Sequence, residues 1–132
     1  MSNAAIRCEV PRIPPLLNTT LRQHWGKRRR TARAWAWEIK AATIGHIPAE
    51  PFARAHVLIE RFSRALPDDD GLVGGCKPLL DVLQPASKRH PYGLGIIAGD
   101  DPVHLTAEYR PRLVKARHDE KTVITIMPLE SS

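Results

Sequence analysis

Two clusters of aspartates carry the chemistry that this sequence offers. The first is Asp68, Asp69 and Asp70, and the second is Asp100 and Asp101. Gathered carboxylates repel one another, by about 1 kcal/mol per pair at 4 Å in water and about 4 kcal/mol at an effective dielectric constant of 20. A cation between them removes that cost, and Mg²⁺ or Mn²⁺ accepts carboxylate oxygens beside those of a phosphate. The two clusters therefore predict a divalent metal site.

The spacing indicates which of these side chains converge. In an extended segment, Asp68 and Asp70 point to the same side and the middle aspartate points away. Asp101 would then complete a set of three ligands, and Lys77, in the first turn of a following helix, would reach the bound phosphate. The alternative is that both clusters are turns whose aspartates cap the elements that follow them.

The charge of the chain is divided unevenly. There are 20 Lys and Arg against 14 Asp and Glu, a net charge of +6. Residues 68–101 hold six acidic and three basic residues, so this window carries −3 and the remainder carries +9. A strongly basic surface favours a polyanionic partner. An enzyme that acts on nucleic acid with a divalent metal fits both parts of this distribution.

Four stretches in which hydrophobic and polar residues alternate, and two with helical periodicity, must position these residues. Strands are expected at 5–10, 54–62, 103–109 and 122–127, and helices over 31–43 and from about residue 76. The last two strands should form an antiparallel hairpin with a long basic connection. The order is βαβαββ, an α+β domain with a mixed sheet and helices packed on it.

Length and composition agree with a single domain over residues 1–132. The two cysteines, Cys8 and Cys76, form no metal-ligand spacing and no disulfide framework, which indicates the cytoplasm. No apolar run approaches membrane-spanning length, so no membrane partner is expected.

Basic residues around the first helix and in the loop after the second predict a phosphate-binding surface. The run that ends at residue 30 is expected to be a loop, in which Trp25 is the candidate for stacking on an unpaired base. Trp35, and in part Trp37, are expected in the core. The predicted DNA-binding residues are Arg22, Lys27, Arg28, Arg29, Arg30, Arg33, Lys88 and Arg89.

The acidic clusters and the residues between them resemble the D-x-D-N-L…K…D…DD pattern of the RusA-type Holliday-junction resolvases of phages and prophages. The likeness extends to Pro14-Pro15, Asn18 and the βαβαββ order, so it covers nearly the whole chain. Gly71 stands where that family usually has Asn, and about three extra residues precede Lys77. The matching residues are Asp68-Asp69-Asp70-Gly71-Leu72, Lys77, Asp81, Ile97 and Asp100-Asp101.

This resemblance implies a small α+β homodimer that uses Mg²⁺ or Mn²⁺ to resolve four-way DNA junctions in recombination and repair. It implies that Asp68, Asp70 and Asp101 hold the metal and that Asp100 assists them. Lys77 would act as a cation near the scissile phosphate, so that Asp70, Lys77 and Asp101 are the catalytic residues.

Two other functions stay open. One is a restriction-type metal nuclease that acts on linear duplex, although Gly75 stands where the acid of the usual acid-x-Lys pair would precede Lys77. The other is a non-catalytic basic DNA-binding protein, in which the acids are turns and caps. Tight metal-free binding without cleavage would separate this protein from both enzymes.

Overall fold

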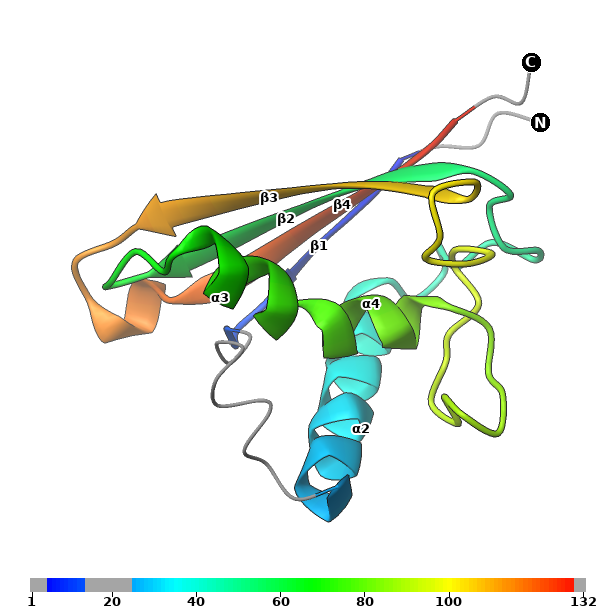
Figure 1. Ribbon diagram of the computed structural model, residues 1–132, viewed down its shortest axis with the longest axis horizontal. Coiled ribbons are helices and arrows are strands. Elements are labelled where there is room, and N and C mark those ends of the chain that lie inside the picture. The colour runs from blue at the N-terminus through cyan, green and yellow to red at the C-terminus, as the bar shows by residue number, and fades with distance from the viewer. Residues whose placement is uncertain (1–4, 14–24, 130–132) are drawn as a thin grey trace.

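The computed structural model describes residues 5–13 and 25–129, apart from the side chains of residues 25–29 and 69. Figure 1 shows the arrangement of its helices and strands. Their order is β1 (Ile6–Val10), α2 (Trp25–Ala42), β2 (Ala55–Ser63), α3 (Asp69–Gly75), α4 (Lys77–Leu83), β3 (Leu105–Leu113), a 3₁₀ turn (Arg117–Asp119) and β4 (Lys121–Pro128).

The four strands form one mixed sheet in the order β1-β4-β2-β3. β4 runs antiparallel to both β1 and β2, whereas β2 and β3 are parallel and are joined through α3 and α4. The expected α+β class and mixed sheet are therefore confirmed.

The predicted hairpin between the last two strands is wrong, because β4 lies between β1 and β2 and does not pair with β3. The side chains explain this order. Val123, Ile124 and Ile126 of β4 are all buried, and Val123 faces the opposite side of the sheet from the other two. Burial on both faces is typical of a central strand. β3 is mostly exposed or half-buried and contains Pro111, which lacks a backbone N–H and belongs on an edge.

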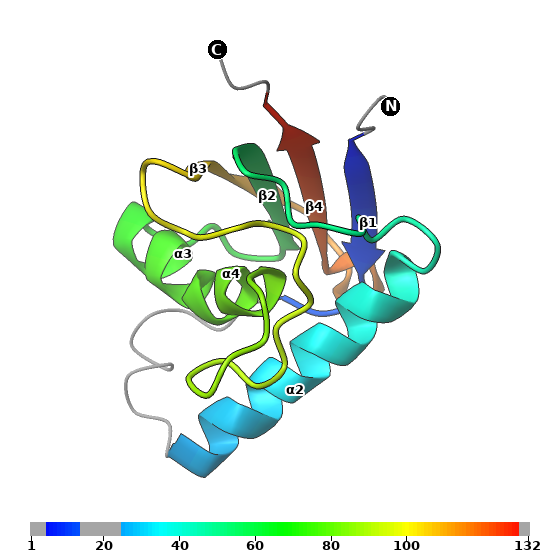
Figure 2. The same cartoon turned by 90° about the vertical axis from the view of Figure 1, so that its right-hand side faces the viewer.

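The helices cover one face of this sheet, as Figures 1 and 2 show. Trp35 and Ile39 of α2 and Leu79 and Leu83 of α4 are all fully buried against the inward side chains of the strands. Burying each such side chain contributes roughly 1.5–3 kcal/mol. This single core fixes the position of α4, on which Lys77 lies.

Helix α2 begins at Trp25, six residues before the expected start at Thr31. Lys and Arg have high helix propensity, so the basic run extends the helix and is not a loop. Thr31 is consequently inside the helix and does not cap it. Among the described residues, no helix is both long and apolar enough to pass through a membrane.

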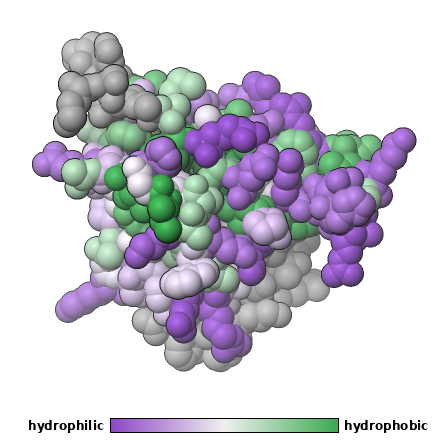
Figure 3. Space-filling model, turned by 180° about the vertical axis from the view of Figure 1, so that it is seen from behind, coloured by the Kyte–Doolittle hydropathy of each residue, from purple (hydrophilic) through white to green (hydrophobic). Residues whose placement is uncertain are grey.

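Figure 3 shows the molecule from behind, with hydrophilic residues over most of the surface and smaller hydrophobic patches between them. The outward face of the sheet contributes charged side chains that pair with one another. Glu60 bonds Arg112 of the neighbouring strand at 3.0 Å, and Lys121 bonds Glu9 at 3.2 Å. This face is polar because only the opposite face of the sheet is covered by helices.

Candidate functional site

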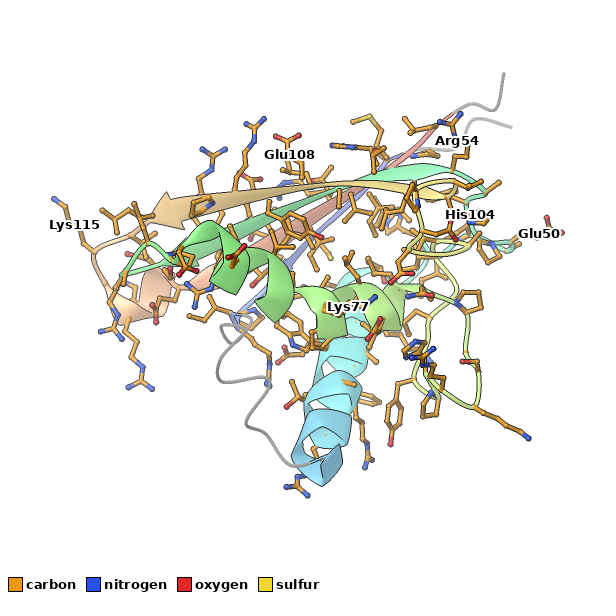
Figure 4. The ribbon with its side chains drawn as sticks, viewed as in Figure 1. Glu50, Arg54, Lys77, His104, Glu108 and Lys115 are labelled. Atoms are coloured by element: carbon orange, nitrogen blue, oxygen red, sulfur yellow. The ribbon has the colours of Figure 1, made fainter. Side chains whose placement is uncertain are left out.

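Lys77, the first residue of α4, lies between two carboxylates. Its Nζ donates a hydrogen bond to Oδ2 of Asp100 and lies 3.4 Å from Oδ1 of Asp81. Asp81 is one helical turn further along α4, as its four-residue spacing from Lys77 predicts. Asp100 comes from the loop that leads to β3, and Figure 4 shows Lys77 on α4 with His104 near the start of that strand.

Buried hydrophobic residues hold the loop that carries Asp100. Ile96 and Ile97 are fully buried, and the backbone N–H groups of both donate to the carbonyl of Leu83, at 2.8 and 3.0 Å. Phe52 holds the same segment by two backbone hydrogen bonds. Its N–H donates to the carbonyl of Ile96, and its carbonyl accepts the N–H of Ala98. The end of α4 and the approach to β3 are thereby joined, which brings Asp100 to the beginning of the helix.

The Lys77 and Asp100 charges stabilise each other. Partial burial acts to lower the pKa of Lys77, but the hydrogen bond with Asp100 and the charge of Asp81 outweigh it and raise that pKa above its ordinary value. The hydrogen bond from Lys77 lowers the pKa of Asp100. At neutral pH the site therefore contains a protonated amine beside an ionised carboxylate.

Asp101 is engaged by the turn that follows it. Its Oδ2 lies 2.8 Å from Nδ1 of His104, and its Oδ1 accepts the backbone N–H of Val103 at 2.9 Å. The hydrogen bond with His104 is the main reason that the pKa of Asp101 is lowered. The carboxylate is thus ionised and oriented, and half of its side chain is exposed.

The first acidic cluster is not extended, which contradicts the geometry expected from the sequence. Asp68 is the N-cap of α3 and its Oδ1 accepts the N–H of Gly71 at 2.7 Å, while Asp69 and Asp70 form the first turn of the helix. Asp70 lies on α3, whereas Lys77 begins the separate helix α4, and among the described side chains the ion pairs of Lys77 are with Asp81 and Asp100. Asp68 fulfils the capping role that was the alternative.

The structure therefore brings together only part of the expected set. Lys77 contacts both Asp100 and Asp81, and Asp101 follows Asp100 in the chain, whereas no ion pair joins Asp68 or Asp70 to this cluster among the described side chains. Among the described side chains, no three or more of His, Cys, Asp and Glu are close enough to hold one metal ion. The predicted set of four carboxylates is not assembled in this arrangement.

The predicted DNA-binding residues are described only in part. Arg30 and Arg33 are exposed on α2, and Lys88 and Arg89 are exposed in the loop after α4. Arg22 lies outside the described residues. Lys27, Arg28 and Arg29 belong to α2, but their side chains lie outside the description.

Two histidines of the site were not among the predicted site residues. His104 contacts Asp101, and Nε2 of His90 lies 3.9 Å from Oδ1 of Asp81. The three-residue spacing of Asp101 and His104 in a Pro-containing turn was the signal for the first contact. The second depends on how the loop after α4 folds, and the sequence has no signal for it.

Comparison with protein-family models finds no match for this chain, and comparison with curated proteins finds none either. The relation to the RusA-type resolvases therefore stays a proposal that depends on the residues quoted above.

The Lys77–Asp100 contact predicts how stability depends on pH. Because the pKa of Asp100 is lowered in the folded state, its contribution is present above its ordinary value of 3.8 and is lost as the pH falls through the folded value. The Asp100→Asn variant should therefore be less stable than the parent at pH 7, and this difference should shrink below about pH 4. Urea unfolding at pH 7, 5 and 3 measures the difference.

Glu50→Gln is the control, because Glu50 is exposed and forms no ion pair among the described residues. Its stability relative to the parent should show no comparable pH dependence. A constant penalty for Asp100→Asn across the three pH values would contradict the coupling.

Proposed function

We propose that this chain is a Mg²⁺-dependent, structure-selective endodeoxyribonuclease that cuts four-way DNA junctions in recombination and repair, as the RusA-type resemblance implies. One observation carries the proposal: the Lys77 ammonium is held between the carboxylates of Asp81 and Asp100, with Asp101 next in the chain. A cation among ionised carboxylates, in a protein of net charge +6, suits a phosphodiester substrate.

Two of the four predicted carboxylates, those of Asp100 and Asp101, fit a Mg²⁺ site. Mg²⁺ in phosphoryl-transfer sites is commonly bound by one or two carboxylates, several waters and the phosphates of the substrate. Asp100 and Asp101 supply two ionised carboxylates, whose side chains are 29% and 51% exposed. Asp68 and Asp70 do not fit the same set. A bound ion would polarise the phosphate and lower the pKa of a coordinated water.

The protein side chains have separate roles in this proposal. Asp81 and Asp100 hold Lys77 at the beginning of α4, where its charge offsets the negative charge that develops on the phosphate in the transition state. His104 forms a hydrogen bond with Asp101 and so orients its carboxylate, as residues that hydrogen-bond to metal ligands commonly do. The exposed arginines and lysines, among them Arg30, Arg33 and Lys88, contact the DNA backbone.

The cysteines support a reducing compartment, and we propose the cytoplasm. Cys8 and Cys76 are both free and buried. Burial raises the pKa of the Cys8 thiol to about 11 and that of Cys76 to about 12, so both stay protonated and unreactive at neutral pH.

A second candidate is a DNA-binding protein without catalysis. The carboxylates of Asp68 and Asp101 already accept backbone hydrogen bonds, as caps and turns do. This candidate needs no metal-binding group, so it requires no further ligand beside Asp100 and Asp101.

One assay distinguishes the two candidates. Labelled four-way junction, matched linear duplex and flap DNA are each incubated with the protein, with and without Mg²⁺. The nuclease should cut the junction only with Mg²⁺ and cut linear duplex much less. Equal cutting of junction and linear duplex would favour a different metal nuclease, and tight binding with no cleavage would favour the binding protein.

We also propose that the protein is a homodimer. Resolution of a four-way junction needs paired cuts in opposed strands, and a two-fold dimer presents two identical sites for them. Light scattering at micromolar concentration should therefore return about twice the chain mass of 14.8 kDa. A monomer that makes one unpaired nick per junction would contradict the resolvase function.

A further inference from the structure

An exposed tryptophan lies within a basic band on α2. Arg30, Arg33, Trp37 and Lys40 follow one another at spacings of three or four, so they share one side of the helix. Trp37 is 75% exposed, although the sequence predicted it to be partly in the core. The core side of α2 is formed instead by Trp35, Ala36 and Ile39, which are buried, and the N-terminal part of the helix extends away from the sheet in Figure 2.

The charge of this helix is one-sided. Residues 25–42 contain six Lys and Arg and a single acid, Glu38, which is bound at 2.9 Å by Arg12 from the segment after β1. No ion pair joins Arg30, Arg33 or Lys40 to an acid among the side chains that the structure describes.

This charge acts against the stability of the helix. The first turn contains no acidic residue, and several basic residues lie near it. Basic residues are unfavourable there, because this is the positive end of the helix dipole. The cost falls if a polyanion binds there. Two copies of this band would repel each other, which excludes a second α2 as its natural occupant.

We propose that the α2 band, defined as Arg30, Arg33, Trp37 and Lys40, binds an unpaired DNA strand, with Trp37 stacked on a base and the three cations on neighbouring phosphates. Indole rings stack on any base, and basic side chains that follow the backbone complete such platforms. From Arg30 to Lys40 the helix rises by ten residue steps, about 15 Å, so the band is longer than one nucleotide. The proposal rests on the proposed function, because a protein that opens base pairs at the branch point of a junction exposes unpaired nucleotides there.

The test measures binding in EDTA, where cleavage plays no part. A fluorescein-labelled oligothymidylate and a blunt duplex are titrated by anisotropy. Trp37→Ala should weaken oligothymidylate binding by about 5- to 150-fold, the loss of one stacked base, and change duplex binding little. Trp37→Phe should retain most of the affinity. Leu113→Ala, at a hydrophobic position on β3 that is 65% exposed, is the control and should change neither.

The cations are tested through salt dependence. Arg33→Gln and Lys40→Gln should each reduce the slope of log affinity against log salt for the oligothymidylate by about 0.7. Equal oligothymidylate affinity in the parent and Trp37→Ala would overturn the proposal. So would a change of mass in light scattering on that substitution, which would make the band a subunit contact. If junctions are never cut but oligothymidylate binding still depends on Trp37, the proposed nuclease activity is wrong, whereas the proposed role of the α2 band in binding is retained.

Discussion

Replacing Asp100 by asparagine is expected to reduce junction cleavage by about 100-fold, while junction binding in EDTA stays equal or becomes tighter. The amide keeps the size of the side chain but removes the charge that holds Lys77 and that would hold Mg²⁺. Binding is spared, because removal of a negative charge weakens repulsion of the DNA backbone. Single-turnover cleavage and anisotropy on the same junction measure the two effects.

Two further variants sharpen this experiment. Glu50→Gln removes an exposed carboxylate that Figure 4 shows away from Lys77, and it should cleave like the parent. Asp70→Asn tests whether the first acidic cluster contributes to cleavage. Cleavage is expected to be retained if Asp100 and Asp101 suffice as ligands. An equal loss in Asp70→Asn would restore the larger set that the sequence predicts, and full activity of Asp100→Asn would remove the metal site from this loop.

Lys77→Ala is expected to lower the rate of cleavage by about 10²–10³, the cost of losing one charge-stabilising donor in a transition state. Affinity for the junction should change little, because the other basic side chains that we propose as contacts of the DNA backbone remain. Lys77→Arg should restore little activity, since a planar guanidinium does not replace a compact ammonium between Asp81 and Asp100. Rate constants at saturating protein separate turnover from binding.

Lys115→Ala provides the matched control. Lys115 is exposed beyond the end of β3, far from the Lys77 site in Figure 4, so its loss removes an equal charge without touching the cluster. Cleavage at saturation should be unchanged. A Lys77→Ala variant that binds weakly but cuts at the normal rate would make Lys77 an ordinary phosphate contact.

The fold could be predicted from local patterns where one periodicity dominates. Alternation in 5–10, 54–62 and 122–127 located β1, β2 and β4 to within about two residues, and Pro78 marked the beginning of α4. Strand pairing could not be predicted in the same way. Sequential strands usually pair, but burial of Val123 on the second face of the sheet requires a neighbour on each side of β4.

The site shows the same division between local and long-range information. The contact of Lys77 with Asp81 follows from helical spacing, whereas the contact with Asp100 depends on how Ile96 and Ile97 bind the end of α4. The state of Asp68 was ambiguous because aspartate is both a metal ligand and an N-cap, and only the backbone N–H of Gly71 decides between them here. Trp37 was misplaced because Trp35, Ala36 and Trp37 are consecutive apolar residues, so their sequence does not show which of them lie on the buried face of α2.

The central place of β4 has a consequence for synthesis of the protein. Ile6 of β1 pairs with Ile126 of β4, so β1 cannot join this sheet until β4, which follows it much later in the chain, has left the ribosome. Throughout that interval Ile6, Cys8 and Val10 have no neighbouring strand of the sheet beside them. Contacts between such distant parts of a chain fold slowly and leave hydrophobic surface open to aggregation. The side chains of β1 are therefore expected to bind chaperones or to aggregate during synthesis until β4 has been made, a demand that the finished fold conceals.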